Sequence, residues 1–203
     1  GEDGPTHEPV EQEAQIRLME KLHNHSGRPS VMVLRPADAE ETTAAWKMAM
    51  ENIYTPTALI LSRQDVTSVP NTSAEGVKKG AYIVSKDENP QVVMLASGSE
   101  VSTLMAGAAL LRAEGIRLQI VSVPSEAIFR QQSKEYQAEV LPQGVTRFGL
   151  TAGLPCNLEG LVGEHGTVWG LNSFGFSAPY KVLDEKLGFT AENVYNQVKA
   201  LLG

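Results

Sequence analysis

The first nine residues, GEDGPTHEP, contain side chains that can bind and act on a polyhydroxylated substrate. Asp3 and His7 stand four positions apart in a segment whose glycines and prolines indicate a loop. An aspartate accepts hydrogen bonds from hydroxyl groups, and a histidine donates or accepts a proton near neutral pH. Arg63 follows the apolar run TALIL, and a guanidinium at the end of a strand suits a phosphate group. Together these residues predict a site for a phosphorylated polyol, with a surface ion pair as the alternative role for Arg63.

Three other segments carry residue types found in functional sites, and each has a simpler structural interpretation. The segment LASGSEV could hold an anion at a helix N-terminus, but it lacks the GxGxxG pattern and the P-loop lysine. A tight turn at Gly98 followed by Ser99 as a helix cap explains this segment without a ligand. His23 and His25 have no further ligand at metal-binding spacing, and Cys156 is expected to be a small buried or half-buried side chain. We therefore predict no metal ligands in this chain.

Composition excludes several classes of protein. The 203 residues are 42% hydrophobic and 20% charged, which is typical of a globular protein with a buried core. The formal net charge of -7 argues against a nucleic-acid partner, because binding a phosphate backbone needs a basic surface. A single cysteine predicts a reducing compartment, which we take to be the cytoplasm. No apolar run approaches the roughly 20 residues of a membrane helix, so no membrane association is expected.

Alternating apolar runs and amphipathic segments predict the elements that must position these side chains. Before residue 70, we expect a short helix in AQIRLMEKL, a buried strand in VMVLRPAD, an amphipathic helix and a second strand in TALIL. Asp38 and Glu41 form a capping-box-like start for the amphipathic helix, whose apolar residues Trp46, Met50 and Ile53 share one face. Strand, helix and strand with short connections indicate a parallel βαβ unit.

A polar segment at 71–80 is expected to be a linker, and the alternation resumes after it. About five strands with helices between them predict an α/β sheet covered by helices on both faces. We expect Thr190 to cap the last helix. The predicted domains are therefore 1–70 and 81–203.

Several stretches closely resemble sequences of the transketolase family. Its members are thiamine-diphosphate enzymes of the pentose phosphate pathway. Before residue 70 they are GEDGPTHEPVEQ, LRPADAEETTAAWKMAMEN and TPTALILSRQ; after it they are GAYIVSKDENPQVVMLASGSEV, IVSVPS, VTRFGLTAG and FGFSAP. The resemblance covers the whole chain, and its D-G-P-T-H-x-P motif is specific. It implies the end of a pyrimidine-binding α/β domain at 1–70. A three-layer C-terminal domain at 81–203, with a predominantly parallel sheet and helices on both faces, would follow the linker.

The resemblance also implies a function. The parent enzyme would be a homodimer that transfers a two-carbon ketol unit from a ketose phosphate to an aldose phosphate, using thiamine diphosphate with Mg²⁺ or Ca²⁺. Asp3 would contact a hydroxyl of the donor ketose, His7 would bind the donor and assist proton transfer, and Arg63 would bind the terminal phosphate. The family's cofactor- and metal-binding motifs have no counterpart in this sequence, so we expect an inactive C-terminal fragment that binds no cofactor by itself.

The sequence departs from the family pattern at two places, and two alternative functions remain open. The segment KLHNHSGRPS is longer than the common family pattern, and Asn172 stands where many members have an aspartate. A dihydroxyacetone-synthase-like relative would share the same chemistry. Alternatively, the chain, or its part from Ala81 to Gly203, is a ligand-sensing or dimer-stabilising α/β module.

Overall fold

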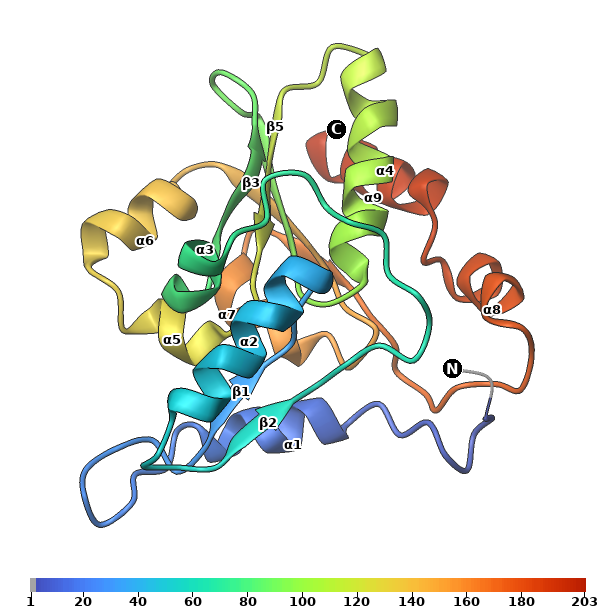
Figure 1. Ribbon diagram of the computed structural model, residues 1–203. Helices are drawn as coiled ribbons and strands as arrows, with labels where there is room; N and C mark the ends of the chain where they lie inside the picture. The colour runs from blue at the N-terminus through green and yellow to red at the C-terminus, as the bar shows by residue number, and fades with distance from the viewer. Residues whose placement is uncertain (1–2) are drawn as a thin grey trace.

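The computed structural model describes residues 3–203, and its first part contains the predicted parallel βαβ unit (Figure 1). The elements before residue 70 are α1 (Gln12–Met19), β1 (Met32–Leu34), α2 (Ala39–Glu51) and β2 (Thr57–Leu59). Strands β1 and β2 pair in parallel, with Val33 opposite Ala58. Asp38 caps α2 as predicted, because its carboxylate accepts a hydrogen bond from the Glu41 N–H at 3.0 Å.

The second part is a three-layer α/β sandwich, which confirms the predicted fold class. Its elements are α3 (Ala74–Lys79), β3 (Tyr82–Lys86), β4 (Val92–Ala96), α4 (Glu100–Ala113), β5 (Leu118–Ser122), α5 (Glu126–Arg130), α6 (Lys134–Val140), β6 (Thr146–Leu150), α7 (Cys156–Val162), β7 (Thr167–Trp169), α8 (Tyr180–Leu187) and α9 (Ala191–Leu202). The sheet has the order β3-β5-β4-β6-β7, and β3 is antiparallel to β5 while the other pairs are parallel.

Alternate residues of the central strand β4 face opposite layers of helices. Met94 packs in a core with residues of α4 and α9, whereas Leu95 packs with residues of α5, α6 and α7. Thr190 caps α9 by accepting a hydrogen bond from the Asn193 N–H at 3.2 Å, as the sequence predicts.

The predicted linker, residues 71–80, contains the short helix α3, for which Ser73 acts as N-cap and Gly80 as left-handed C-cap. Two local expectations were wrong. Ser99 does not cap α4, since its hydroxyl donates to the carboxylate of Glu100. The predicted amphipathic helix was expected to include Ile53, but α2 ends at Glu51 and its C-cap Asn52 is extended. Trp46 and Met50 of α2 are 52% and 77% exposed, and smaller side chains are buried instead.

A buried carboxylate joins the two parts of the chain. One oxygen of Glu41 accepts hydrogen bonds from the Tyr82 hydroxyl at 2.7 Å and the Ser122 hydroxyl at 2.6 Å. The other accepts the Ala37 N–H at 2.7 Å. Burial raises the pKa of the Glu41 carboxyl, and this group is fully buried. The beginning of α2 is therefore bound to β3 and β5 through one side chain.

A buried arginine makes the second connection. The guanidinium of Arg35 donates to the Ser97 carbonyl and the Glu100 carboxylate, and lies 3.6 Å from a carboxylate oxygen of Glu13. Burial alone would lower the pKa of Arg35, but the two carboxylates raise it. A Cβ atom on Gly98 would lie 2.5 Å from the Arg35 Cζ atom, so the glycine of LASGSEV makes room for this side chain.

None of the helices in the described range 3–203 is both long enough and apolar enough to cross a membrane.

We predict that Glu41→Ala lowers the free energy of unfolding by about 2–4 kcal/mol, because it leaves buried hydrogen-bond donors without an acceptor. Glu40→Ala is the matched control, since Glu40 is exposed on the same turn of α2 and should change stability by less than about 0.5 kcal/mol. Urea unfolding followed by tryptophan fluorescence measures both. Equal, small effects would show that the Glu41 network does not hold the two parts together.

Candidate functional site

The opening loop places Asp3 and His7 on one exposed turn before α1. The N–H of His7 donates to the Gly4 carbonyl at 3.1 Å, and Gly4 adopts a left-handed conformation with φ of 86°. The His7 Nδ1 atom lies 2.8 Å from the Thr6 hydroxyl oxygen. Gly1 and Glu2, the first two residues of the motif, lie outside the described residues. The imidazole is therefore oriented by its neighbour and accessible to a small molecule.

Arg63 meets Asp3 although the two residues belong to segments far apart in the chain. Arg63 lies on the segment after β2, and its Nη1 atom is 2.6 Å from an Asp3 carboxylate oxygen. The hydrogen bond from Arg63 lowers the pKa of Asp3, and the charge of His7 lowers it further. Both partners of the ion pair are exposed, with side-chain accessibilities of 63% for Arg63 and 52% for Asp3. The structure thus brings the predicted residues together, in a contact that is also a surface ion pair.

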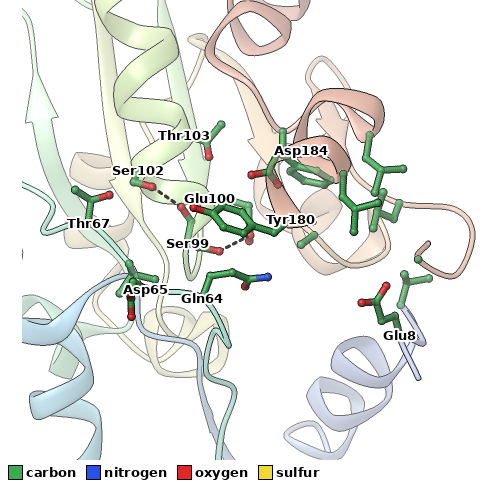
Figure 2. A pocket seen from close by; sticks show the side chains of 18 of the residues that line it. Glu8, Gln64, Asp65, Thr67, Ser99, Glu100, Ser102, Thr103, Tyr180 and Asp184 are labelled. Atoms are coloured by element: carbon green, nitrogen blue, oxygen red, sulfur yellow. Dashed lines mark hydrogen bonds between the residues drawn. The ribbon is translucent and has the colours of Figure 1, made fainter. Parts of the chain in front are cut away.

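A cleft of about 390 Å³ lies beside the residues that directly follow His7 and Arg63 in the chain. Glu8 of the opening loop and Gln64, beside Arg63, both contribute to its walls. The opposite walls come from the start of α4 and from α8 (Figure 2). Ser99 and Ala152, which follow β4 and β6, also line it, so the cleft lies at the carboxyl ends of these strands. Strand order reverses between β4 and β6, which is the usual position of a ligand site in an open α/β sheet.

The cleft is lined by hydroxyl groups and carboxylates. The described polar lining residues are Glu8, Gln64, Asp65, Thr67, Ser99, Glu100, Ser102, Thr103, Tyr180 and Asp184, and they include no lysine or arginine. Burial raises the pKa of the Asp184 carboxyl, and the nearby Glu100 carboxylate raises it further. Such a surface suits hydroxyl groups better than phosphates. Arg63 lies outside the cleft, and the start of α4 presents no lysine or arginine to it.

The remaining candidate residues form no such cluster. His23 forms an isolated β-bridge with Pro29, and His25 is exposed. Within 3–203, no group of three or more His, Cys, Asp or Glu side chains is arranged to hold a metal ion. Cys156 is exposed, whereas the sequence led us to expect a buried or half-buried thiol. The reason is its place at the start of α7, where Leu158 and Leu161 face the core instead.

Sequence reasoning missed the α8 wall of the cleft. Tyr180 and Asp184 lie one helical turn apart, which is the spacing of any exposed helix face. Nothing in that spacing indicates that α8 lies across from α4. The wall is a product of tertiary packing and carries no local sequence signal.

Comparison with known proteins identifies relatives for the whole chain. The family model described as "Transketolase, pyrimidine binding domain" matches residues 1–68, and "Transketolase-like TK C-terminal domain" matches residues 80–190. The transketolases of Geobacillus stearothermophilus and Bacillus subtilis (strain 168) are 45% and 44% identical over 100% of this chain. The chain spans 30% of the length of each of these two relatives.

Solved structures agree with these sequence relatives. Transketolase from Leishmania mexicana superposes with a TM-score of 0.89 at 40% identity, covering 100% of this chain and 28% of that one. A split-gene transketolase, described as an inactive β4 tetramer, has a TM-score of 0.76 at 26% identity and covers 98% of this chain and 64% of that one.

We predict that Arg63→Ala raises the pKa of Asp3. Arg63 stabilises the ionised carboxylate, so the protonated form becomes relatively more favourable when the guanidinium is removed. The Asp3 carboxyl should then titrate at higher pH, which carbon-detected NMR of the side chain measures. Arg28→Ala, which removes an arginine that stacks on Tyr54, is the control and should leave Asp3 unchanged. An unchanged Asp3 titration in Arg63→Ala would show that the ion pair does not persist in solution.

Proposed function

Since this chain belongs to the transketolase family, we propose that it supplies sugar-binding residues of an enzyme that transfers a two-carbon ketol unit from a ketose phosphate to an aldose phosphate. This reaction belongs to the pentose phosphate pathway. The observation that supports the proposal is the meeting of Asp3 and Arg63 at 2.6 Å, with His7 on the same loop. A carboxylate, a guanidinium and an imidazole are the groups that a phosphorylated, polyhydroxylated substrate requires.

Each of the three side chains has a distinct proposed role. Arg63 binds the terminal phosphate of the sugar, because a guanidinium matches phosphate geometry with paired N–H donors. The Asp3 carboxylate, whose pKa the hydrogen bond from Arg63 lowers, accepts a hydrogen bond from a hydroxyl of the donor. His7 hydrogen-bonds the donor near its terminal hydroxyl and its carbonyl oxygen. It also assists the proton transfer that accompanies making and breaking the bond between the two-carbon unit and the rest of the sugar.

Thiamine diphosphate would supply the electron sink for this transfer when bound. The residues described here do not fit it: no group of acidic, histidine or cysteine side chains in 3–203 can hold the accompanying Mg²⁺ or Ca²⁺. The cleft beside Arg63 is lined by carboxylates, which would repel a diphosphate. We therefore propose that the cofactor is bound by the polypeptide that the relatives carry outside the matched 30%.

The exposed face of α2 is the proposed contact with that polypeptide. Trp46 and Met50 lie one turn apart on α2 and are exposed, as is Ile53 beyond the end of the helix. This apolar surface lies beside a sheet of two strands, β1 and β2. An isolated pair of strands is marginal in water and gains stability when further elements cover it. Since the split-gene relative is described as an inactive tetramer, we propose that this chain by itself catalyses no ketol transfer and self-associates.

A chimera tests the proposed function. These 203 residues replace the matching portion of the Geobacillus stearothermophilus transketolase, and ketol transfer is then assayed. We predict an active enzyme in which His7→Ala lowers kcat by about 100-fold or more, since a proton transfer is lost. Arg63→Ala should raise KM for phosphorylated donors about tenfold with little change in kcat, because the phosphate is bound equally in ground and transition states.

Arg28→Ala serves as the control for both variants, since Arg28 stacks on Tyr54 away from the site. An active chimera in which His7→Ala and Arg63→Ala both keep the parent kinetics would refute the proposed residue roles. An inactive chimera that is folded and dimeric would refute the proposed function of the chain.

We further predict that Met50→Asp destabilises the chimera and leaves the isolated chain as stable as before. Met50 is 77% exposed, so its replacement costs the isolated chain less than about 0.5 kcal/mol. In the chimera the proposed contact would bury this charge, which should lower the melting temperature by several degrees in thermal unfolding. Leu110→Asp, at a partly exposed leucine of α4, is the control. An unchanged melting temperature of the Met50→Asp chimera would place the contact elsewhere.

A further inference from the structure

The loop between β7 and α8 lies directly against the opening loop, although the two are at opposite ends of the described chain (Figure 1). The N–H of Gly175 donates to the backbone carbonyl of Glu8 at 3.4 Å. The Glu8 carboxylate in turn accepts the backbone N–H of Asp3 at 3.1 Å. A series of contacts therefore runs from Gly175 through Glu8 and Asp3 to Arg63.

Glycine at position 175 is explained by Glu8 and not by backbone conformation. Gly175 lies outside the left-handed region, so an alanine is allowed by its φ angle. A Cβ atom there would overlap a carboxylate oxygen of Glu8 and lie 2.9 Å from its Cδ atom. The two nearest atoms belong to the end of a flexible side chain, and the third, the Glu8 Cβ atom at 3.1 Å, would have to shift by only a few tenths of an ångström. An alanine would thus push the Glu8 carboxylate away from Asp3 without disturbing the core.

A second close approach holds the same loop. Gly4 has a φ of 86°, and a Cβ atom on it would lie 3.3 Å from the Cβ atom of Ser177. The loop after β7 therefore touches the opening loop on both sides of the turn that carries His7. Neither Gly175 nor Ser177 is among the residues with a proposed role in binding the sugar.

We propose that Glu8 and Gly175 are positioning residues, and that together they hold the opening loop so that the Asp3 carboxylate meets Arg63. The expected functional consequence, tighter binding of the sugar donor, rests on the proposed function. The D-G-P-T-H-x-P motif leaves the position of Glu8 open, so the role comes from the contacts and not from the motif. The loop after β7 thereby shapes a site to which it contributes no substrate-binding group.

The first experiment measures the Asp3 titration by NMR in the isolated 203-residue chain. Gly175→Ala should raise the pKa of Asp3, because the displaced Glu8 no longer holds Asp3 beside Arg63. Gly160→Ala is the matched control: its Cβ atom would meet the end of another flexible side chain, 3.0 Å from the Arg130 Nη2 atom, far from the loop. Thermal unfolding of both variants should match the parent chain. An unchanged Asp3 pKa in Gly175→Ala would overturn the proposal.

Substitutions of Glu8 separate its hydrogen bond from its charge. Glu8→Gln keeps an acceptor oxygen for the Asp3 N–H and removes the charge, whereas Glu8→Ala removes both. Asp3 should therefore titrate at higher pH in Glu8→Ala than in Glu8→Gln. Adding Gly175→Ala to Glu8→Ala should have no further effect, since the two changes act through the same carboxylate. Additive effects in the double variant would overturn the proposed route through Glu8.

The second experiment measures kinetics in the chimera with the Geobacillus stearothermophilus enzyme. Gly175→Ala should raise KM for the sugar donor about three- to tenfold, the effect of losing one hydrogen bond, while Gly160→Ala keeps the parent KM. A shifted Asp3 pKa with an unchanged KM would overturn the positioning role. An inactive parent chimera would count against the proposed function alone, because the titration decides independently whether Glu8 and Gly175 hold the loop.

Discussion

The hydrogen bonds to the buried Glu41 carboxylate are the interaction on which the arrangement of this chain depends. They connect the beginning of α2 to strands β3 and β5, whose residues Tyr82 and Ser122 come much later in the sequence. A buried carboxylate is costly unless its oxygens are satisfied, and here three donors from two parts of the chain satisfy them. Because the network requires all of these donors at once, it allows one relative placement of the βαβ unit and the larger sheet. That placement brings the segment after β2 to the carboxyl ends of β4 and β6.

Arg35 forms a second connection between the βαβ unit and the larger sheet. Its guanidinium binds the Ser97 carbonyl and the Glu100 carboxylate, which lie at the end of β4 and the start of α4. The first turn of α4 is therefore occupied by an internal arginine, and the turn at Gly98 is shaped to receive it. This explains why a segment that resembles an anion-binding turn has no lysine or arginine facing the cleft. Arg63, in contrast, is exposed and pairs with Asp3 at the surface, whereas the guanidinium of Arg35 is buried and paired inside.

Much of this arrangement follows from local sequence, and the rest depends on partners that no local pattern names. The caps at Asp38 and Thr190 were predictable, because each follows from side chains acting within one helical turn. So were the parallel βαβ unit and the two-sided sheet, which follow from apolar periodicity. Ser99 was assigned wrongly as a cap because its hydroxyl is bound to Glu100, whose orientation depends on the distant Arg35. Asp3 and Arg63 were selected from residue chemistry, and the structure places them in contact. The α8 wall and the contact of Glu8 with Gly175 arise instead from packing between the ends of the described chain.

The contact between these two loops has a consequence for the order of events during synthesis. The elements of the βαβ unit leave the ribosome before any strand of the larger sheet, and their pairing partners are close in sequence. The turn that carries His7 contacts the loop around Gly175, which is made after every strand of the larger sheet. A nascent chain would therefore complete its scaffold before it forms the contacts that hold the turn with His7. Incomplete products that end before β7 would carry Asp3, His7 and Arg63 but would lack the contact between Glu8 and Gly175.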